Sequence, residues 1–155
     1  MSTRSNIVIE NGKSKIYLYR HHDGYLAETG ADLYRKLVAA RFNAGEFLQS
    51  LIDDRYDGYG SPKPVYELTS EIHGDIEFLY RVVFKRSAGK RVSVGYSEFK
   101  PGSERPSSAS KVEVGKFDAF RKECNEGIAY ANSVIAEWNS RQLGGKSWAL
   151  KEVLV

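Results

Sequence analysis

The segment Tyr19-Arg20-His21-His22-Asp23-Gly24-Tyr25 concentrates side chains that could do chemistry. It holds two of the chain's three histidines, a carboxylate, an arginine and two tyrosines. The segment follows a hairpin signal and precedes a long helical pattern, and the exit of a strand into a loop is where a scaffold usually displays functional groups. Two chemistries are open to it: metal binding, and acid/base catalysis by His21, His22 or Asp23.

The spacing specifies neither chemistry. Adjacent residues of an extended chain point to opposite sides, so His21 and His22 are poorly placed to share one metal ion. The simpler interpretation is that one histidine packs or hydrogen-bonds while Asp23-Gly24 forms a turn. The single cysteine, Cys124, excludes a multi-cysteine zinc site and is expected to be a buried thiol on a helix. No nucleophile–base or paired-carboxylate set can be assembled, which favours a protein without enzymatic activity, bound metal or cofactor.

A second set of functional side chains is basic. Arg81, Lys85, Arg86, Lys90 and Arg91 cluster around one predicted turn. A two-stranded ribbon with a cationic tip can contact phosphates, and neighbouring tyrosines can stack on bases. The other interpretation is a solvated turn whose cations protect a sheet edge. A nucleic-acid-binding or nucleotide-binding module is therefore an alternative function.

Ten of the 155 residues are tyrosines, and Tyr17 and Tyr19 fall on the sheet face predicted to lie opposite the helices. A surface of tyrosine and arginine with apolar neighbours is typical of a protein interface. Half-buried tyrosines with solvated hydroxyls are the alternative. The predicted binding residues are Tyr17, Tyr19, Arg20, His22, Asp23 and Tyr25 together with Arg81, Lys85, Arg86, Lys90 and Arg91.

Length and composition predict one soluble domain over residues 1–155, because 17.5 kDa with 41% hydrophobic residues can build one core. No apolar run approaches the roughly 20 residues needed to span a bilayer, and the polar N-terminus lacks the apolar region of a secretory signal. A cytoplasmic location is expected. Residues 26–80 carry five Lys/Arg against ten Asp/Glu, and residues 81–116 carry nine against three. These blocks either steer a charged partner or neutralise each other by packing side by side.

The first half of the chain predicts a hairpin and helices. Asn11-Gly12 is a strong turn signal between two apolar stretches. Residues 30–54 have a helical apolar stripe, with Thr29 as a capping residue and Asn43 as a second N-cap that divides the segment into two short helices. The glycines and prolines of residues 56–64 predict a loop.

The second half predicts strands followed by one long helix. One strand carries Tyr66, Leu68 and Ile72, the next alternates from Ile76 to Phe84, and a third spans 92–96. Residues 100–110 are expected to form a mobile surface loop, residues 117–143 a helix, and residues 149–155 a tail that adds an edge strand or covers the core. The order β-β-α-β-β-β-α predicts an α+β fold, an antiparallel sheet of about five strands with helices packed on one face.

A set of residues within about the first 40 carries a resemblance: Thr3-Arg4-Ser5-Asn6-Ile7, the segment from Tyr19 to Tyr25, Gly30 and Leu33. This part of the chain resembles a family of small uncharacterised proteins of phages, prophages and bacterial accessory regions. His22 and Leu26 depart from the family's pattern, which has an aromatic residue and a proline there. The resemblance implies a phage or mobile-element context in which proteins of this size bind and block a host machine. It therefore favours a non-enzymatic accessory protein that occludes a host protein complex in the host cytoplasm, such as an anti-CRISPR-like, anti-defence inhibitor.

Overall fold

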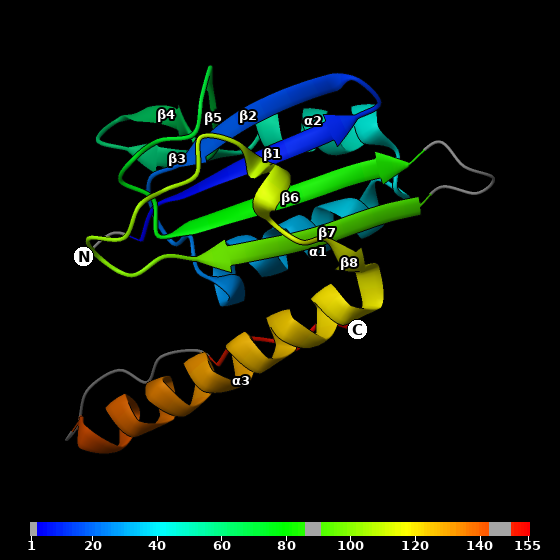
Figure 1. Cartoon of the computed structure of the whole chain (residues 1–155). Helices are drawn as coiled ribbons and strands as arrows, with labels where there is room; N and C mark the ends of the chain where they lie inside the picture. Colours follow the sequence, from blue (N-terminus) through cyan, green and yellow to red (C-terminus); the bar gives the residue numbers. More distant parts are fainter. Residues whose placement is uncertain (1–2, 86–90, 143–149) are drawn as a thin grey trace.

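The chain folds around a six-stranded mixed sheet with helices on one face (Figure 1). The computed structural model describes residues 3–85, 91–142 and 150–155, and for Arg91 the backbone alone. In chain order the strands of the main sheet are β1 (Ser5–Asn11), β2 (Ser14–Arg20), β5 (Glu67–Thr69), β6 (Phe78–Lys85), β7 (Arg91–Glu98) and β8 (Gly115–Lys116). A separate two-stranded ribbon is formed by β3 (Arg55–Gly58) and β4 (Ser61–Pro64).

The sheet is mixed, so the prediction of an antiparallel sheet of about five strands is only coarsely correct. Its strand order is β5-β2-β1-β6-β7-β8, and β6 runs parallel to β1. The sequence suggested that β5 and β6 form a hairpin, but β5 lies at one edge beside β2. Both β1 and β6 are covered on both faces, which explains their continuous apolar runs, such as Ile7-Val8-Ile9.

The predicted hairpin at Asn11-Gly12 is confirmed, with a shift of one residue in its turn. Asn11 pairs with Ser14, so the turn residues are Gly12 and Lys13. Gly12 has a φ of 64°, and glycine at the first turn position suits a two-residue hairpin loop.

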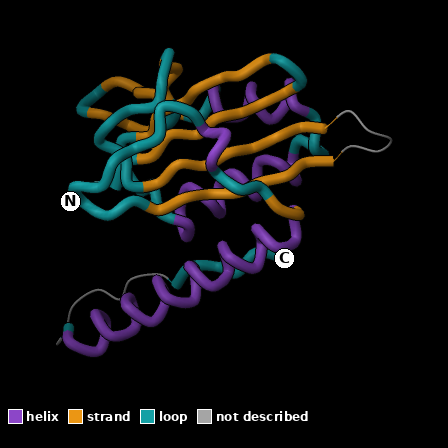
Figure 2. The backbone as a smooth tube through the Cα atoms, in the orientation of Figure 1, coloured by secondary structure: helices purple, strands orange, loops and turns teal. Residues whose placement is uncertain are grey.

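Helices cover one face of the sheet (Figure 2). A π-helical turn, η1 (Leu26–Gly30), leads into α1 (Ala31–Ala39), and α2 (Ala44–Ile52) follows. Asn43 caps α2 through a hydrogen bond from the Glu46 amide, which confirms the predicted division into two helices. Thr29 is no cap, because it lies inside η1 and its hydroxyl donates to the Asp23 carbonyl oxygen.

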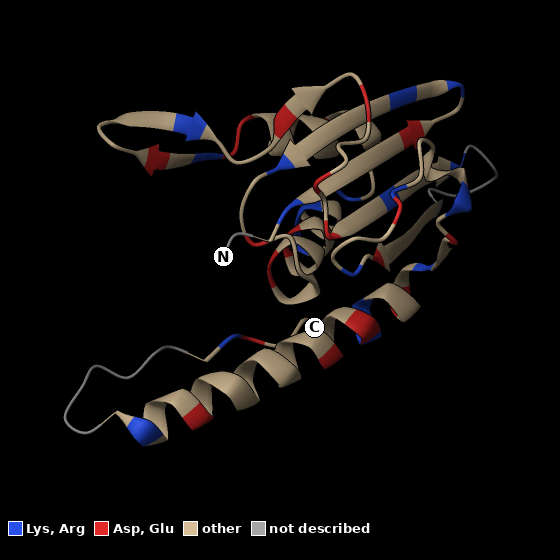
Figure 3. Cartoon of the chain, turned by 60° about the vertical axis from the view of Figure 1, so that its left-hand side comes forward, with Lys and Arg blue, Asp and Glu red and all other residues tan. Residues whose placement is uncertain are grey.

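The last helix, α3 (Phe117–Arg141), buries only part of its predicted apolar stripe. Phe120, Cys124 and Ile128 join the helix-side core, whereas Val134 and Trp138 are exposed. The C-terminal end of α3 reaches beyond the end of β7 in Figures 1 and 3, which leaves these side chains without a sheet to cover them. The glycines expected to end the helix lie outside the described residues.

The other face of the sheet is also covered. The segment from Phe99 to Val112, which includes a 3-10 turn η2 (Ala109–Lys111), crosses in front of the strands in Figure 1. Ala109 and Val112 are buried there against Val8 and Leu79. The mobility expected for residues 100–110 stays a prediction, but the tyrosine surface expected on this face is largely covered.

Candidate functional site

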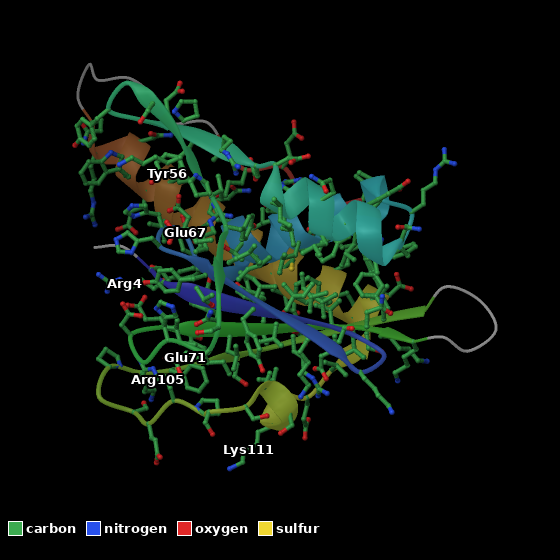
Figure 4. The ribbon with its side chains drawn as sticks, turned by 90° about the horizontal axis from the view of Figure 1, so that it is seen from above. Arg4, Tyr56, Glu67, Glu71, Arg105 and Lys111 are labelled. Atoms are coloured by element: carbon green, nitrogen blue, oxygen red, sulfur yellow. The ribbon has the colours of Figure 1, made fainter. Side chains whose placement is uncertain are left out.

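A pocket opens between the loop after β2 and the β3–β4 ribbon. It has a volume of 440 Å³ and contains most of the segment singled out from the sequence. Its lining comprises Arg20, His21, His22, Asp23, Tyr56, Pro64, Val65 and Glu67. Tyr56 and Glu67 lie at the same end of the molecule as Arg4 in Figure 4.

The backbone of Asp23-Gly24 fixes the wall of this pocket. Asp23 has a left-handed φ of 57°, and the Gly24 amide donates to the Thr3 carbonyl oxygen over 2.8 Å. A Cβ on Gly24 would lie 2.9 Å from that oxygen, so only glycine fits against the start of β1. The Tyr80 hydroxyl also donates to the Gly24 carbonyl oxygen. These contacts hold Asp23-Gly24 against the residues that precede β1, and the turn predicted at Asp23-Gly24 stays a prediction.

The three histidines gather around Tyr19. His73 stacks on the Tyr19 ring at 4.1 Å between centroids, and His21 contacts His22 edge-on at 4.5 Å. The Tyr19 hydroxyl donates to Asp75, and burial followed by the charge of Asp75 raises the pKa of Tyr19 to about 12. Tyr19 is 7% exposed, so it supports the loop and offers little surface to a partner. Within residues 3–85, 91–142 and 150–155, no group of three metal-ligating side chains occurs.

Arg20 belongs to a polar network that fastens the loop to α1. Its guanidinium donates to the His22 carbonyl oxygen over 2.8 Å and to the Tyr66 hydroxyl over 3.0 Å. Tyr66 donates in turn to Asp32 over 2.6 Å, and Asp32 pairs with Lys36. Burial and the nearby Asp32 raise the pKa of Tyr66 well above its usual range, which keeps the phenol neutral. Arg20 is thus a structural cation, since its Nε and Nη1 atoms donate to groups of the same chain.

Two other predicted tyrosines lie outside this pocket. Tyr25 is half-buried and lines a different groove, beside α3, where the Lys151 ammonium lies over its ring at 5.3 Å. Tyr17 is half-buried against the apolar cluster on the opposite face of the sheet.

Lys85, one of the residues predicted around the basic turn, lies at the other end of the sheet. Because β6 has eight residues, Lys85 at its C-terminal end is about 23 Å from Phe78 at its start. Lys85 is exposed. Arg81 is not a free cation, since it pairs with Glu10 and donates to the Val112 carbonyl oxygen.

Arg86 and Lys90 lie outside the described residues, as does the side chain of Arg91. Of the basic residues that the structure describes, neither Arg81 nor Lys85 lines the pocket beside the tyrosine loop. None of the ion pairs found among the described residues joins the acidic block, 26–80, to the basic block, 81–116.

The β3–β4 ribbon replaces the loop predicted over residues 56–64. It projects from the body of the protein in Figure 3. Gly58 pairs with Ser61, and the two turn residues, Tyr59 and Gly60, have positive φ values of 45° and 93°. This is the pattern of a type I′ turn, whose first position favours asparagine, aspartate or glycine. Tyr59 is fully exposed at the tip.

Sequence reasoning missed this ribbon because Pro62 and Pro64 indicated a loop. A two-stranded ribbon tolerates them, since each strand has a free edge where no amide donor is required. The signal that could have found it is Asp57-Gly58-Tyr59-Gly60, in which glycines flank an aromatic residue.

Comparisons with known proteins leave the function to be argued from this geometry. No protein-family model, no curated protein and no solved structure matches the chain. In the part of the chain that the structure describes, no helix is long and apolar enough to cross a membrane.

Proposed function

We propose that this protein is a non-enzymatic binding protein, and that its recognition surface is the β3–β4 ribbon with the pocket at its base. The observation that carries the proposal is the exposed ring of Tyr59, held in a left-handed turn. A left-handed conformation costs an L-residue about 1–2 kcal/mol, and bulky side chains adopt it rarely. Because the ring is fully exposed, it buries no surface against the described residues that would offset this cost. Backbone strain that the fold does not need is a mark of functional sites.

The pocket gives this surface a second point of contact. The half-exposed ring of Tyr56 lines the pocket, and Asp23 and Glu67 supply exposed carboxylates. A tyrosine at the tip and a polar hollow behind it suit a protein surface that offers an apolar patch beside a basic side chain. The rigid attachment of Asp23-Gly24 keeps the hollow preformed, which lowers the entropic cost of binding.

The partner we propose is a host protein complex, occluded by this surface. The proposal extends the resemblance of the N-terminal segment to phage accessory proteins, and an anti-defence inhibitor acting in the host cytoplasm is its narrower form. A nucleic-acid partner would instead use the exposed Lys85 and its neighbours, at the opposite end of the sheet.

A capture experiment separates these partners. Tagged wild type, Tyr59→Asn and Tyr59→Phe are incubated with host lysate, with and without nuclease, and retained proteins are identified by mass spectrometry. We expect one protein at near-stoichiometric amount after nuclease treatment, retained by wild type and Tyr59→Phe and lost with Tyr59→Asn. Capture that disappears with nuclease would favour a nucleic-acid partner. Equal capture by all three proteins would contradict the proposal that the β3–β4 ribbon is the recognition surface.

A further inference from the structure

The second half of α3 carries an apolar stripe that is exposed in the part of the chain that the structure describes. Tyr130 is 73% exposed, Val134 48% and Trp138 51%. These residues recur every four positions and therefore lie on one side of the helix. Asn125 and Asn132, which hold the C-terminal tail, lie on another side, so the tail does not cover the stripe.

A groove of 560 Å³ runs beside this stripe. Gly127, Tyr130 and Val134 form its helix side, and Tyr25 and Phe78 form much of the opposite wall. Glu98 at the end of β7 adds an acidic group to the rim. The groove is thus apolar along its length, and its rim carries one acidic group, Glu98, and one basic group, Lys151.

The residues on this side of α3 are complementary to the same residues of a second α3 helix that runs in the opposite direction. From the N-terminus they are Glu123, Gly127, Tyr130, Val134, Trp138 and Arg141, at spacings of three or four. When a second helix runs antiparallel, the acidic end of one meets the basic end of the other. Trp138 then comes opposite the part of the groove where Gly127 packs against Leu26 of its own chain, and Tyr130 comes opposite Val134. Opposite charges at the ends and apolar side chains in the middle are what a self-complementary helix pair requires.

We propose that α3 pairs antiparallel with α3 of a second copy of this chain, with Trp138 of each copy seated beside Gly127 of the other. The groove has room for an indole, and Tyr25, Phe78 and Tyr130 offer it aromatic surfaces. The pairing is two-fold symmetric, so both grooves are filled in one event.

The charges at the two ends fit the same arrangement. Arg141 is highly exposed, and its ion pair in the described residues is with Glu137 of the same helix. Glu123 has no ion pair among the described residues, and burial together with the charge of Glu126 raises its pKa. The guanidinium of Arg141 from the second copy would relieve this acidic pair.

Sedimentation velocity over a wide concentration series tests the pairing with the full chain. We expect wild type to change from 17.5 kDa to twice that mass with increasing concentration, and Trp138→Ala to stay at 17.5 kDa. The exposed position of Trp138 means that this variant keeps its fold, which thermal melting will verify. A wild type that remains monomeric at every concentration overturns the proposal, and would leave the groove to a different protein.

Charge reversal tests the antiparallel register. Glu123→Arg alone and Arg141→Glu alone should each weaken self-association at least tenfold, since like charges then meet at both ends. Mixed together, the two variants should form a heterodimer, because every Arg–Arg and Glu–Glu contact becomes Arg–Glu. Failure of the mixture to associate, with both variants folded, overturns the antiparallel arrangement. Neither result depends on the β3–β4 ribbon, so this inference and the proposed function fail separately.

Discussion

We expect the replacement of Asn125 by alanine to release the C-terminal tail from its seat between α1 and α3. The Asn125 side chain donates to the Leu154 carbonyl oxygen over 3.1 Å and accepts from the Leu154 amide over 2.6 Å. Asn132 makes the same pair of bonds with Lys151, at 3.0 and 2.7 Å. The two asparagines are two helical turns apart, about 10 Å, and three extended residues cover the same distance. The two asparagine side chains of α3 therefore bind the backbone of the tail at the spacing of an extended chain.

The magnitude follows from the lost hydrogen bonds. Each bond contributes about 0.5–1.5 kcal/mol net, so Asn125→Ala removes about 1–3 kcal/mol from the attachment of the tail. That range corresponds to a roughly 5- to 150-fold increase in the fraction of time the tail is open. Leu154 is buried in the core, and its side chain leaves the core when the tail opens.

Amide hydrogen exchange measures this opening directly. The Leu154 and Lys151 amides are the donors to the two asparagines, so both should exchange faster in Asn125→Ala if the tail opens as one unit. Amides of β1, such as that of Val8, should keep their wild-type rates. Unchanged protection of Leu154 in Asn125→Ala would refute the attachment by asparagine.

Three further predictions follow from strained or crowded positions. Tyr59→Asn should raise the unfolding free energy by about 0.5–1 kcal/mol, because asparagine tolerates the left-handed turn. In thermal melts the Tm should rise by about 1–4 °C. A lower Tm would mean that the Tyr59 ring packs on the body of the protein. Gly95→Ala places a Cβ 1.8 Å from the Glu113 carbonyl oxygen and should cost about 3 kcal/mol or more in chemical denaturation, whereas Gly115→Ala, with open space around it, should not. Burial raises the pKa of Cys124 from 9.0 to about 12, so the unfolded chain loses the thiol proton at a lower pH than the folded chain does. The unfolding free energy should therefore fall as the pH rises from 9 toward 12. In Cys124→Ala this fall should be less steep than in wild type.

The sequence predicted the elements whose signals are local. Alternation along β6 places Phe78, Tyr80, Val82 and Phe84 in the helix-side core, as expected. Ile76 lies in the other core cluster, because it precedes the strand and escapes the alternation.

Pairings between distant segments could not be predicted in the same way. The parallel alignment of β1 with β6 depends on where the intervening residues cross the sheet, and no residue pattern within either strand records it. The coverage of the second sheet face by Ala109 and Val112 is likewise a tertiary outcome, and it buries side chains that had been expected at an interface.

The sequence located part of the candidate site but did not predict the roles of its residues. The loop at His21 to Asp23 does line a pocket, while Arg20 and Arg81 proved to be internal ion-pairing residues. A charged side chain at a strand end gives no sign, in sequence alone, of whether its partner lies in the same chain. Tyr59 was missed because the feature that distinguishes it, a positive φ at an exposed aromatic residue, is a backbone conformation that the sequence does not reveal.

The measurement that tests the central claim most directly compares stability and capture in one variant. Tyr59→Asn and wild type are melted side by side and then used to retain partners from nuclease-treated host lysate. We predict that Tyr59→Asn is at least as stable as wild type and retains no stoichiometric partner. A variant that keeps the partner at wild-type amounts would contradict the claim that the β3–β4 ribbon is the recognition surface.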